Sequence, residues 1–195
     1  METKEKEPRE SRTKQMMIRA AADLMQRRGY VGTGVAEILT RAEAPRGSLY
    51  HHFPGGKREI AIEAAHYAGR IFERDLHRIT LESDSIDTYL IALCALSKRD
   101  LIATDFEASC PIAATALDVP YDETDILQAC AAAFDLWSIA VANGLKKWGV
   151  DEERSIELGS FFVAALLGAV ISARASRNIK VIDHSFELLK SFVNK

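Results

Sequence analysis

The spacing of the apolar residues is the feature that most constrains the fold, because it follows a helical period along nearly the whole chain. Met17, Ala20, Ala21, Leu24 and Met25 fall at i, i+3, i+4, i+7 and i+8, which places them on one face of a helix. Alternating segments of β-branched residues, which would indicate strands, are absent from the sequence. The chain is therefore predicted to be all-α.

The apolar period, together with Gly and Pro at the junctions, predicts nine helices. They span residues 11–28, 35–42, 46–53, 57–81, 85–103, 105–117, 122–148, 151–175 and 179–193. Asp151, Glu152 and Glu153 place negative charge in the first turn of the eighth helix, where it complements the helix dipole.

Cysteine usage and hydropathy limit the chemistry and the compartment. Cys94, Cys110 and Cys130 form no CxxC pair and have no His at metal-ligand spacing, so neither a disulfide framework nor a metal site is predicted, and no cofactor is expected. The charged N-terminus lacks the apolar segment of a secretory signal, and no uncharged run approaches the roughly 18–20 residues that span a bilayer. A cytoplasmic protein with no membrane partner is expected.

The charge is distributed unevenly along the chain. The formal net charge is −3, but residues 1–58 hold 12 Lys and Arg against 7 Asp and Glu, a net charge of +5, and the remainder carries −8. The net charge of the whole chain therefore does not exclude a nucleic-acid partner for the basic N-terminal part.

Two short helical segments follow Gly32. Each is too short to be stable alone, so they must pack on each other and on the first helix. Pro45 disfavours helical geometry at Ala44, which separates the two segments as in a helix-turn-helix unit. In the second segment Leu49 and Phe53 are spaced to face inward, which leaves the polar residues facing outward.

The outward residues of the second segment, with two flanking residues, suit contact with a DNA duplex. Arginine pairs with guanine or phosphate, hydroxyl groups and His bond to phosphate, and Gly allows close approach to the helix N-terminus. The candidate DNA-binding residues are Thr33, Arg46, Gly47, Ser48, Tyr50, His51, His52 and Lys57. Spacing alone leaves a second interpretation open, in which the two short helices are only a packing unit.

A longer motif surrounds this unit. The segment GYVGTGVAEILTRAEAPRGSLYHHFPGGKREI, residues 29–60, resembles the helix-turn-helix of TetR-family transcriptional regulators, and of their LmrA/YxaF-like branch in particular. The matching positions are Gly29, Tyr30, Thr33, Gly47, Leu49, Tyr50, His52, Phe53 and Lys57. Ala44-Pro45, the added Pro54-Gly55-Gly56 and Cys110-Pro111-Ile112-Ala113 look like features of that branch.

The resemblance implies a homodimeric repressor that binds palindromic operator DNA and is released by a small-molecule effector. It implies a DNA-binding domain at residues 1–56, of which residues 1–10 are expected to be disordered, and an effector-binding and dimerisation domain at residues 57–195. A dimer would present its two recognition helices about 34–36 Å apart. Such a protein would be associated with the nucleoid.

The last two predicted helices combine small and bulky apolar residues. The resemblance implies that they pair with their mates in a four-helix dimer interface. The candidate interface residues are Phe161, Ala165, Gly168, Ala169, Ser172, Phe186 and Leu189. The same composition also fits helices that close a monomeric core.

The middle helices are expected to hold the effector cavity. The candidate lining residues are Phe106, Cys110, Phe134, Trp137 and Asn143, although an aromatic stripe at helical spacing also fits a core. The lining indicates a neutral apolar or aromatic effector. Asp135 or Glu107, if turned inward, would favour a cation instead.

A competing interpretation makes the chain an all-α enzyme. Cys110 would be the nucleophile, with Glu107 three residues earlier on the same helical face and a distant His as base. The sequence contains no Ser/His/Asp or metal motif that would support it, so no catalytic residue is assigned.

Overall fold

A computed structural model describes residues 9–193, with side chains from residue 12 onward, and this part of the chain is helical without strands. The helices are α1 (Arg9–Arg28), α2 (Val35–Arg41), α3 (Ser48–His52), α4 (Gly56–Glu82), α5 (Ile86–Ala103), α6 (Pro111–Asp118), α7 (Thr124–Lys147), α8 (Glu152–Ser176) and α9 (Lys180–Val193). Among the described residues the all-α class and the nine helices are confirmed.

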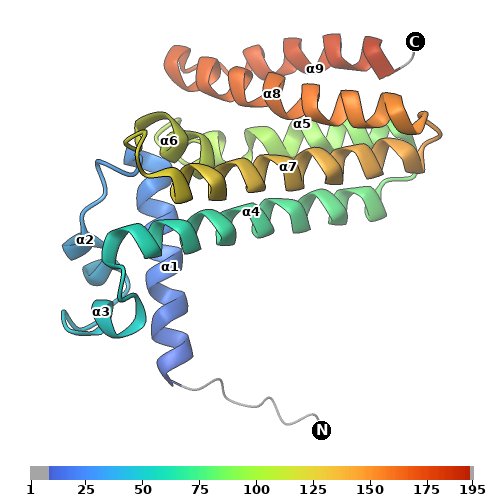
Figure 1. Ribbon diagram of the computed structural model, residues 1–195. Helices are drawn as coiled ribbons and strands as arrows, with labels where there is room; N and C mark the ends of the chain where they lie inside the picture. The colour runs from blue at the N-terminus through green and yellow to red at the C-terminus, as the bar shows by residue number, and fades with distance from the viewer. Residues whose placement is uncertain (1–8, 194–195) are drawn as a thin grey trace, which may run out of the picture.

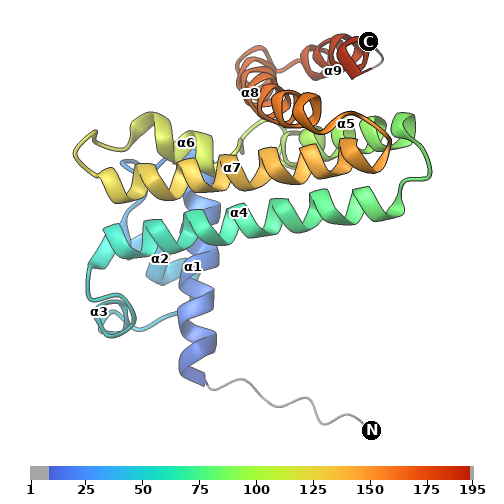
Figure 2. The same ribbon diagram turned by 45° about the vertical axis from the view of Figure 1, so that its right-hand side comes forward.

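The helices form two regions (Figures 1 and 2). The small region holds α2 and α3 beside α1, which crosses the beginning of α4. The large region is a stack of long helices in which α7 packs between α4 and α8, and α9 packs on the outer side of α8. Helices α8 and α9 therefore lie at the far side of the molecule from α3.

The apolar stripe of α1 ties the two regions together. All five stripe residues are buried, as the sequence predicts. Helix α1 packs on α2, α4 and α6, so the first helix of the small region is also part of the wall of the large one. The structure places its start at Arg9. The expectation of disorder is therefore wrong for residues 9 and 10, and its remainder lies outside the described residues.

The predicted helix at residues 105–117 is wrong in its first part. Residues 105–110 form a loop in which Asp105 and Phe106 have φ values of 48° and 66°, incompatible with a right-handed helix. Helix α6 begins at Pro111, and Cys110 is its N-cap. Proline at the first helical position needs no hydrogen-bond partner for its nitrogen, which explains why the helix starts there.

Within residues 9–193, two helices, α7 and α8, are long and apolar enough to cross a membrane by length and composition, with mean hydropathy of 1.4 and 2.0. The sequence analysis expected no membrane-spanning segment because no uncharged run is long enough. The mean hydropathy of a helix is a different criterion, since it tolerates a few charged residues. Core helices of soluble proteins pass the same test. Helix α7 is such a core helix, since it is enclosed between α4 and α8.

Candidate DNA interface and ligand cavity

The two short helices are held in a helix-turn-helix arrangement by a small apolar core. Ile38, Leu49 and Phe53 are fully buried, so α2 and α3 turn their apolar faces inward as the spacing predicts. At the turn, Glu43 adopts a φ of 50° and the Ala44 N–H donates to the carbonyl of Leu39 at 2.9 Å. The left-handed residue reverses the chain and allows α3 to begin three residues after Pro45.

Helix α3 and the two residues before it present most of the predicted polar set outward. Tyr50 is 68% exposed, and Arg46, Gly47 and His51 are exposed, whereas Ser48 and His52 are half-buried. The Ser48 hydroxyl donates to the Pro45 carbonyl at 2.5 Å, so its proton is used within the turn. The surface at α3 is thus open to a partner through the side chains of Arg46, Tyr50 and His51.

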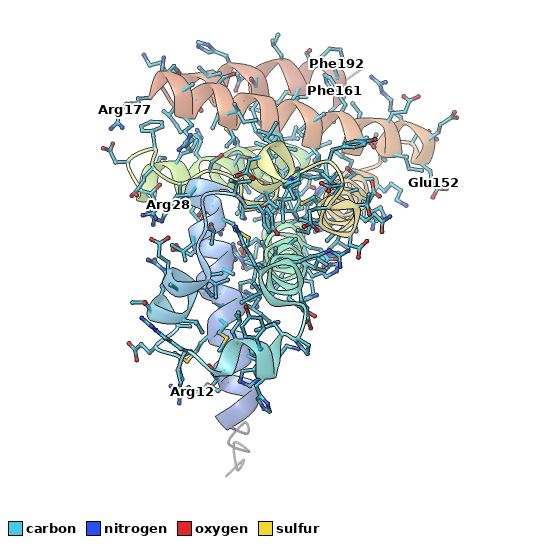
Figure 3. All side chains as sticks on the ribbon, turned by 60° about the vertical axis from the view of Figure 1, so that its left-hand side comes forward. Arg12, Arg28, Glu152, Phe161, Arg177 and Phe192 are labelled. Carbon is cyan, nitrogen blue, oxygen red and sulfur yellow. The ribbon has the colours of Figure 1, made fainter. Side chains whose placement is uncertain are left out.

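The N-terminal part of α1 adds positive charge beside α3. Arg12 is exposed and lies at the same end of the molecule as α3 (Figure 3). The Lys14 ammonium lies 5.2 Å from the centroid of the Phe53 ring, at the end of α3. Neither residue was a candidate in the sequence, because the motif alone does not show that α1 ends beside the recognition helix.

Thr33 requires a correction. It is fully buried, its hydroxyl donates to the Gly29 carbonyl at 2.7 Å, and its N–H donates to the Tyr30 carbonyl at 3.2 Å. Both polar groups that were expected to meet phosphate therefore close the turn after α1 instead.

Lys57 lies beside the same turn. Its ammonium is 4.4 Å from the centroid of the Tyr30 ring and donates to the Val31 carbonyl at 3.4 Å. Burial lowers the pKa of Lys57, and the nearby Asp118 carboxylate opposes that shift. The residue is half-buried, so part of it still faces solvent at the start of α4.

A carboxylate from the large region holds this turn in place. Asp118, the last residue of α6, accepts hydrogen bonds from the N–H groups of Tyr30 at 2.8 Å and Val31 at 2.9 Å. Gly29 has a φ of 69°, and a Cβ at this position would lie 2.2 Å from the Asp118 carboxylate. Glycine is required here both by the backbone conformation and by the close approach of α6.

A cavity of about 310 Å³ lies between α1, α4, α5, α7, α8 and the loop before α6. Its apolar wall is made by Ala22, Ala68, Ile71, Phe72, Leu96, Leu101, Pro111, Trp137, Leu166, Leu167 and Val170. Its polar lining is made by Arg19, Asp23, Gln26, Tyr67, Ser97, Arg99, Asp100, Ser109 and Cys110. The cavity has the size and the mainly apolar character of a small-molecule site.

Two of the five candidate lining residues are at the cavity. Trp137 and Cys110 line it, and the Trp137 indole N–H donates to the Gly69 carbonyl at 2.9 Å, which fixes the ring against α4. The Phe134 ring packs on Trp137 with 5.6 Å between centroids, outside the lining.

The other two candidates lie away from the cavity. Phe106 lies in the loop before α6, where the Arg177 guanidinium is 5.5 Å from its ring centroid. Asn143 is exposed on α7. The expectations for Phe106, Phe134 and Asn143 are therefore wrong for this cavity.

The acidic residues expected to select a cation are also outside the cavity. Asp135 is exposed on α7, and Glu107 is exposed and paired with Arg27 at 2.5 Å. The charged lining comes instead from α1 and α5, which the sequence did not single out. The aromatic residues Tyr67 and Phe72 on the fourth helix were the sequence feature that could have indicated this part of the lining. Only the tertiary packing, however, shows which helices surround the cavity.

The structure does not support a nucleophilic role for Cys110. Its thiol is the N-cap of α6 and accepts from the Ala113 N–H at 3.5 Å. Burial raises the pKa of Cys110 to about 11, so the unreactive thiol form dominates at neutral pH. Glu107 does not share a helix with Cys110, because residues 105–110 are a loop.

An apolar surface covers the outer side of α8 and α9. We call it the α8–α9 face and define it by Phe161, Ile171, Leu188 and Phe192, all exposed. The rings of Phe161 and Phe192 lie at this outer side (Figure 3), with 5.6 Å between their centroids.

The candidate interface residues divide between the outside and the core. Phe161, Gly168 and Ser172 are exposed, and Ala165 is half-buried. Ala169, Phe186 and Leu189 are buried between helices of the same chain, so their assignment to an interface between chains is wrong. The alternative that these helices close a core is therefore correct for the three buried residues, and the interface stays a prediction for the exposed ones.

Comparison with known proteins gives matches over both regions. The family model described as "Bacterial regulatory proteins, tetR family" matches residues 17–64, and "Transcriptional regulator LmrA/YxaF-like, C-terminal domain" matches residues 88–187. An uncharacterized HTH-type transcriptional regulator of Mycobacterium tuberculosis is 34% identical over 87% of this chain and 88% of its own. The HTH-type transcriptional regulator LmrA of Bacillus subtilis is 28% identical over 88% of this chain and 92% of its own length.

Solved structures show the same fold. A TetR-family regulator from Agrobacterium tumefaciens has a TM-score of 0.80 with 18% identity, over 93% of this chain and 98% of its own. The reduced form of Escherichia coli NemR has a TM-score of 0.75 with 19% identity, over 92% of this chain and 97% of its own length. The matched families and relatives are transcriptional regulators, which are not enzymes. With both regions matched by family models and a relative of 34% identity covering most of its length, the chain belongs to the TetR family of DNA-binding transcriptional regulators, in the LmrA/YxaF-like branch.

Proposed function

We propose that this protein is a repressor that binds palindromic operator DNA as a homodimer and releases it when a small apolar or aromatic molecule enters the cavity. The observation that carries the proposal is that α1 forms part of the cavity wall and also packs against α2 of the helix-turn-helix. A molecule in the cavity would therefore touch the DNA-binding unit directly. We assign residues 1–56 to DNA binding and residues 57–195 to effector binding and dimerisation, in a cytoplasmic, nucleoid-associated protein.

The exposed side chains of α3 and of the residues just before it would contact the operator. Arg46 has the geometry for bidentate bonds to guanine, and the Tyr50 hydroxyl reaches a base or phosphate from the centre of the helix. Gly47, Ser48, His51, His52 and Lys57 would supply the surrounding contacts. Arg12 and Lys14 bring further positive charge to the same end of the molecule.

The α8–α9 face would form the dimer interface. Exposed bulky residues beside the small residues Gly168 and Ser172 allow two helices to approach closely and to bury the rings of Phe161 and Phe192. An exposed apolar surface of this kind is unfavourable in water unless it is covered. The same apolar face of a second copy would cover it, and the resulting dimer would place two recognition helices on one operator.

Two connections would carry the effect of a ligand to the DNA-binding unit. In α1, Asp23 lines the cavity and pairs with Arg41 at the end of α2, at 2.5 Å. In α6, Cys110 and Pro111 line the cavity at one end, while Asp118 holds the turn before α2 at the other. A shift of either helix on ligand binding changes the position of α2 and α3.

The name of one relative supports repression rather than activation. The E. coli protein named HTH-type transcriptional repressor NemR is 35% identical over 57 residues, 29% of this chain. Repression by occupying an operator needs only DNA binding and release, both of which the two regions can provide.

Selection from a pool of random duplexes tests the proposal. We expect the purified protein to enrich a motif with twofold symmetry, whose two half-sites are separated by about one helical turn or a multiple of it. Arg46→Ala should abolish the enrichment of specific bases while the protein remains a dimer. Enrichment of no motif, or of a motif without symmetry, would contradict the proposed mode of binding.

A further inference from the structure

The charged residues at the cavity differ in whether they already have a partner. Asp100 accepts from Gln26 at 3.1 Å and pairs with Arg99 at 3.0 Å, and Arg99 also pairs with Asp75 at 2.5 Å. Asp23 pairs with Arg41 on α2 and, more distantly, with Arg27. These charges are therefore balanced by groups of the protein itself.

Arg19 is different. Among the described residues, no carboxylate lies within ion-pair distance of its guanidinium. The guanidinium lies over the face of the Tyr67 ring, 5.9 Å from the ring centroid. A guanidinium that lies over a ring keeps its N–H groups at the edge available, and these form a planar pair of donors suited to a carboxylate.

The position of Arg19 relates this free charge to the apolar space. Arg19 is exposed, so it lies where the cavity meets solvent, and Tyr67 lines the cavity next to it. Phe72 and Trp137 line the same cavity and provide aromatic surface, with 4.7 Å between their ring centroids. The cavity is thus amphipathic: it combines aromatic walls with Arg19, a cation that has no ion-pair partner among the described residues.

From this arrangement we infer that the effector is an aromatic acid, whose ring system packs against Phe72 and Trp137 while its carboxylate binds the Arg19 guanidinium. This inference rests on the proposed function and specifies its ligand. A neutral aromatic compound would leave Arg19 without a charged partner. A cationic one would meet Arg19 while both lining carboxylates remain paired within the protein.

Matched probes of one shape test the charge requirement. The probes are 2-naphthoate, 2-naphthamide and 2-naphthylmethylamine, and binding is followed through the fluorescence of Trp137 in a Trp148→Phe background, which leaves one tryptophan in the chain. We expect the acid to bind about tenfold more tightly than the amide, the factor that one charge-assisted hydrogen bond gives. The amine should bind more weakly than the amide.

Variants of Arg19 test whether this residue causes the preference for the acid over the amide. Arg19→Gln should bring the acid and the amide to within about threefold by weakening the acid alone, and Arg19→Lys should retain part of the preference. Arg70→Gln, which changes an exposed arginine of α4 outside the cavity, is the matched control and should behave as wild type. Circular dichroism checks that each variant is folded.

Three results would overturn the inference. They are equal binding of acid and amide, a preference that survives in Arg19→Gln, or the absence of saturable binding by all three probes. Because the titration contains no DNA, it is independent of operator recognition. A protein that binds the acid but no operator would contradict the proposed function and leave the ligand assignment standing.

Discussion

Lys57 shows how one residue can have both a structural and a DNA-binding role. Its ammonium packs on Tyr30 and bonds to Val31, and its half-buried position at the start of α4 still leaves a route to a phosphate. We expect Lys57→Ala to weaken binding to all DNA sequences and to reduce the salt slope of the binding constant by about 1. Anisotropy titrations at several salt concentrations measure this slope.

The control for Lys57 is Lys146→Ala. Lys146 is an exposed lysine at the end of α7 that pairs with Glu152 at 3.3 Å, and its removal should leave the salt slope unchanged. If Lys57→Ala also leaves the slope unchanged, Lys57 does not contact phosphate, and its role is confined to the turn after α1.

We expect stability to fall at alkaline pH because of two thiols and one phenol: Cys110, which is half-buried, and Cys130 and Tyr89, which are buried. Burial raises the pKa of Cys110 to about 11 and the pKa values of Cys130 and Tyr89 to about 12. In the unfolded chain these groups ionise near pH 9–10, so their contribution to stability is complete below that range and is lost as the pH rises through the folded pKa values. At pH 10.5 the loss is about 2 kcal/mol per thiol.

Urea unfolding at pH 8 and pH 10.5 checks this expectation. The wild type should lose more stability between the two pH values than the Cys110→Ala/Cys130→Ala variant, which lacks the two thiols. An equal loss in both proteins would show that the thiols ionise as readily in the folded state as in the unfolded one.

At the scale of residues, the sequence predicts which side of α3 faces outward but not how each polar group is used. Arg46 and Tyr50 are exposed as predicted, because the i, i+4 spacing of Leu49 and Phe53 determines the inner face. Thr33 was misplaced because its role depends on a hydrogen bond to Gly29 that spacing does not reveal. Arg19 was missed because its importance depends on the tertiary structure, in which it lines the cavity and no carboxylate of the described residues pairs with it.

At the scale of elements, α6 connects the cavity with the turn before α2. Asp118→Ala removes the acceptor for two backbone N–H groups and should cost about 1–3 kcal/mol of stability. It should also lower operator affinity, because the entry to α2 is no longer fixed. Asp122→Ala, at an exposed position in the following loop, is the control.

Denaturation and DNA titration of the two variants separate these effects. Operator affinity that stays at the wild-type value in Asp118→Ala, at a temperature where the variant is folded, would show that α6 does not position the helix-turn-helix.

Helix boundaries were predictable where capping signals were present. Asp151 accepts from the Arg154 N–H, and α8 begins where its acidic first turn predicts. Residues 105–110 were wrongly extended as helix because their composition is compatible with one. The left-handed conformations of Asp105 and Phe106, which neither residue type signals, stop the helix from starting before Pro111.

At the scale of the whole molecule, the N-terminal region has less unpaired positive charge than its net charge of +5 in the sequence suggests. Arg58 pairs with Glu123 and Asp125 of the acidic region, and Arg27 pairs with Glu107. These cations join the two regions and contribute little to the field around DNA. The positive charge near α3 comes from a few residues that include Arg12, Lys14 and Arg46.

The α8–α9 face gives a prediction for assembly. Phe161→Asp/Leu188→Asp places two charges on exposed positions of this face and should convert a dimer into a folded monomer with much weaker operator binding. Sedimentation velocity measures the mass. The control is Leu81→Asp, at another highly exposed leucine outside this face, which should remain dimeric. A dimer that persists in the double variant would place the interface elsewhere.

The most direct test of the central claim is the affinity of the wild-type protein for the DNA upstream of its own gene, measured by anisotropy with excess nonspecific competitor. We expect a specific complex whose affinity falls steeply with salt. It should be lost in Arg46→Ala/Tyr50→Ala, which lacks two exposed side chains proposed to contact bases, one just before α3 and one on it, and retained in Lys146→Ala. Absence of a specific complex, or a complex unaffected by the Arg46 and Tyr50 substitutions, would contradict operator recognition by α3.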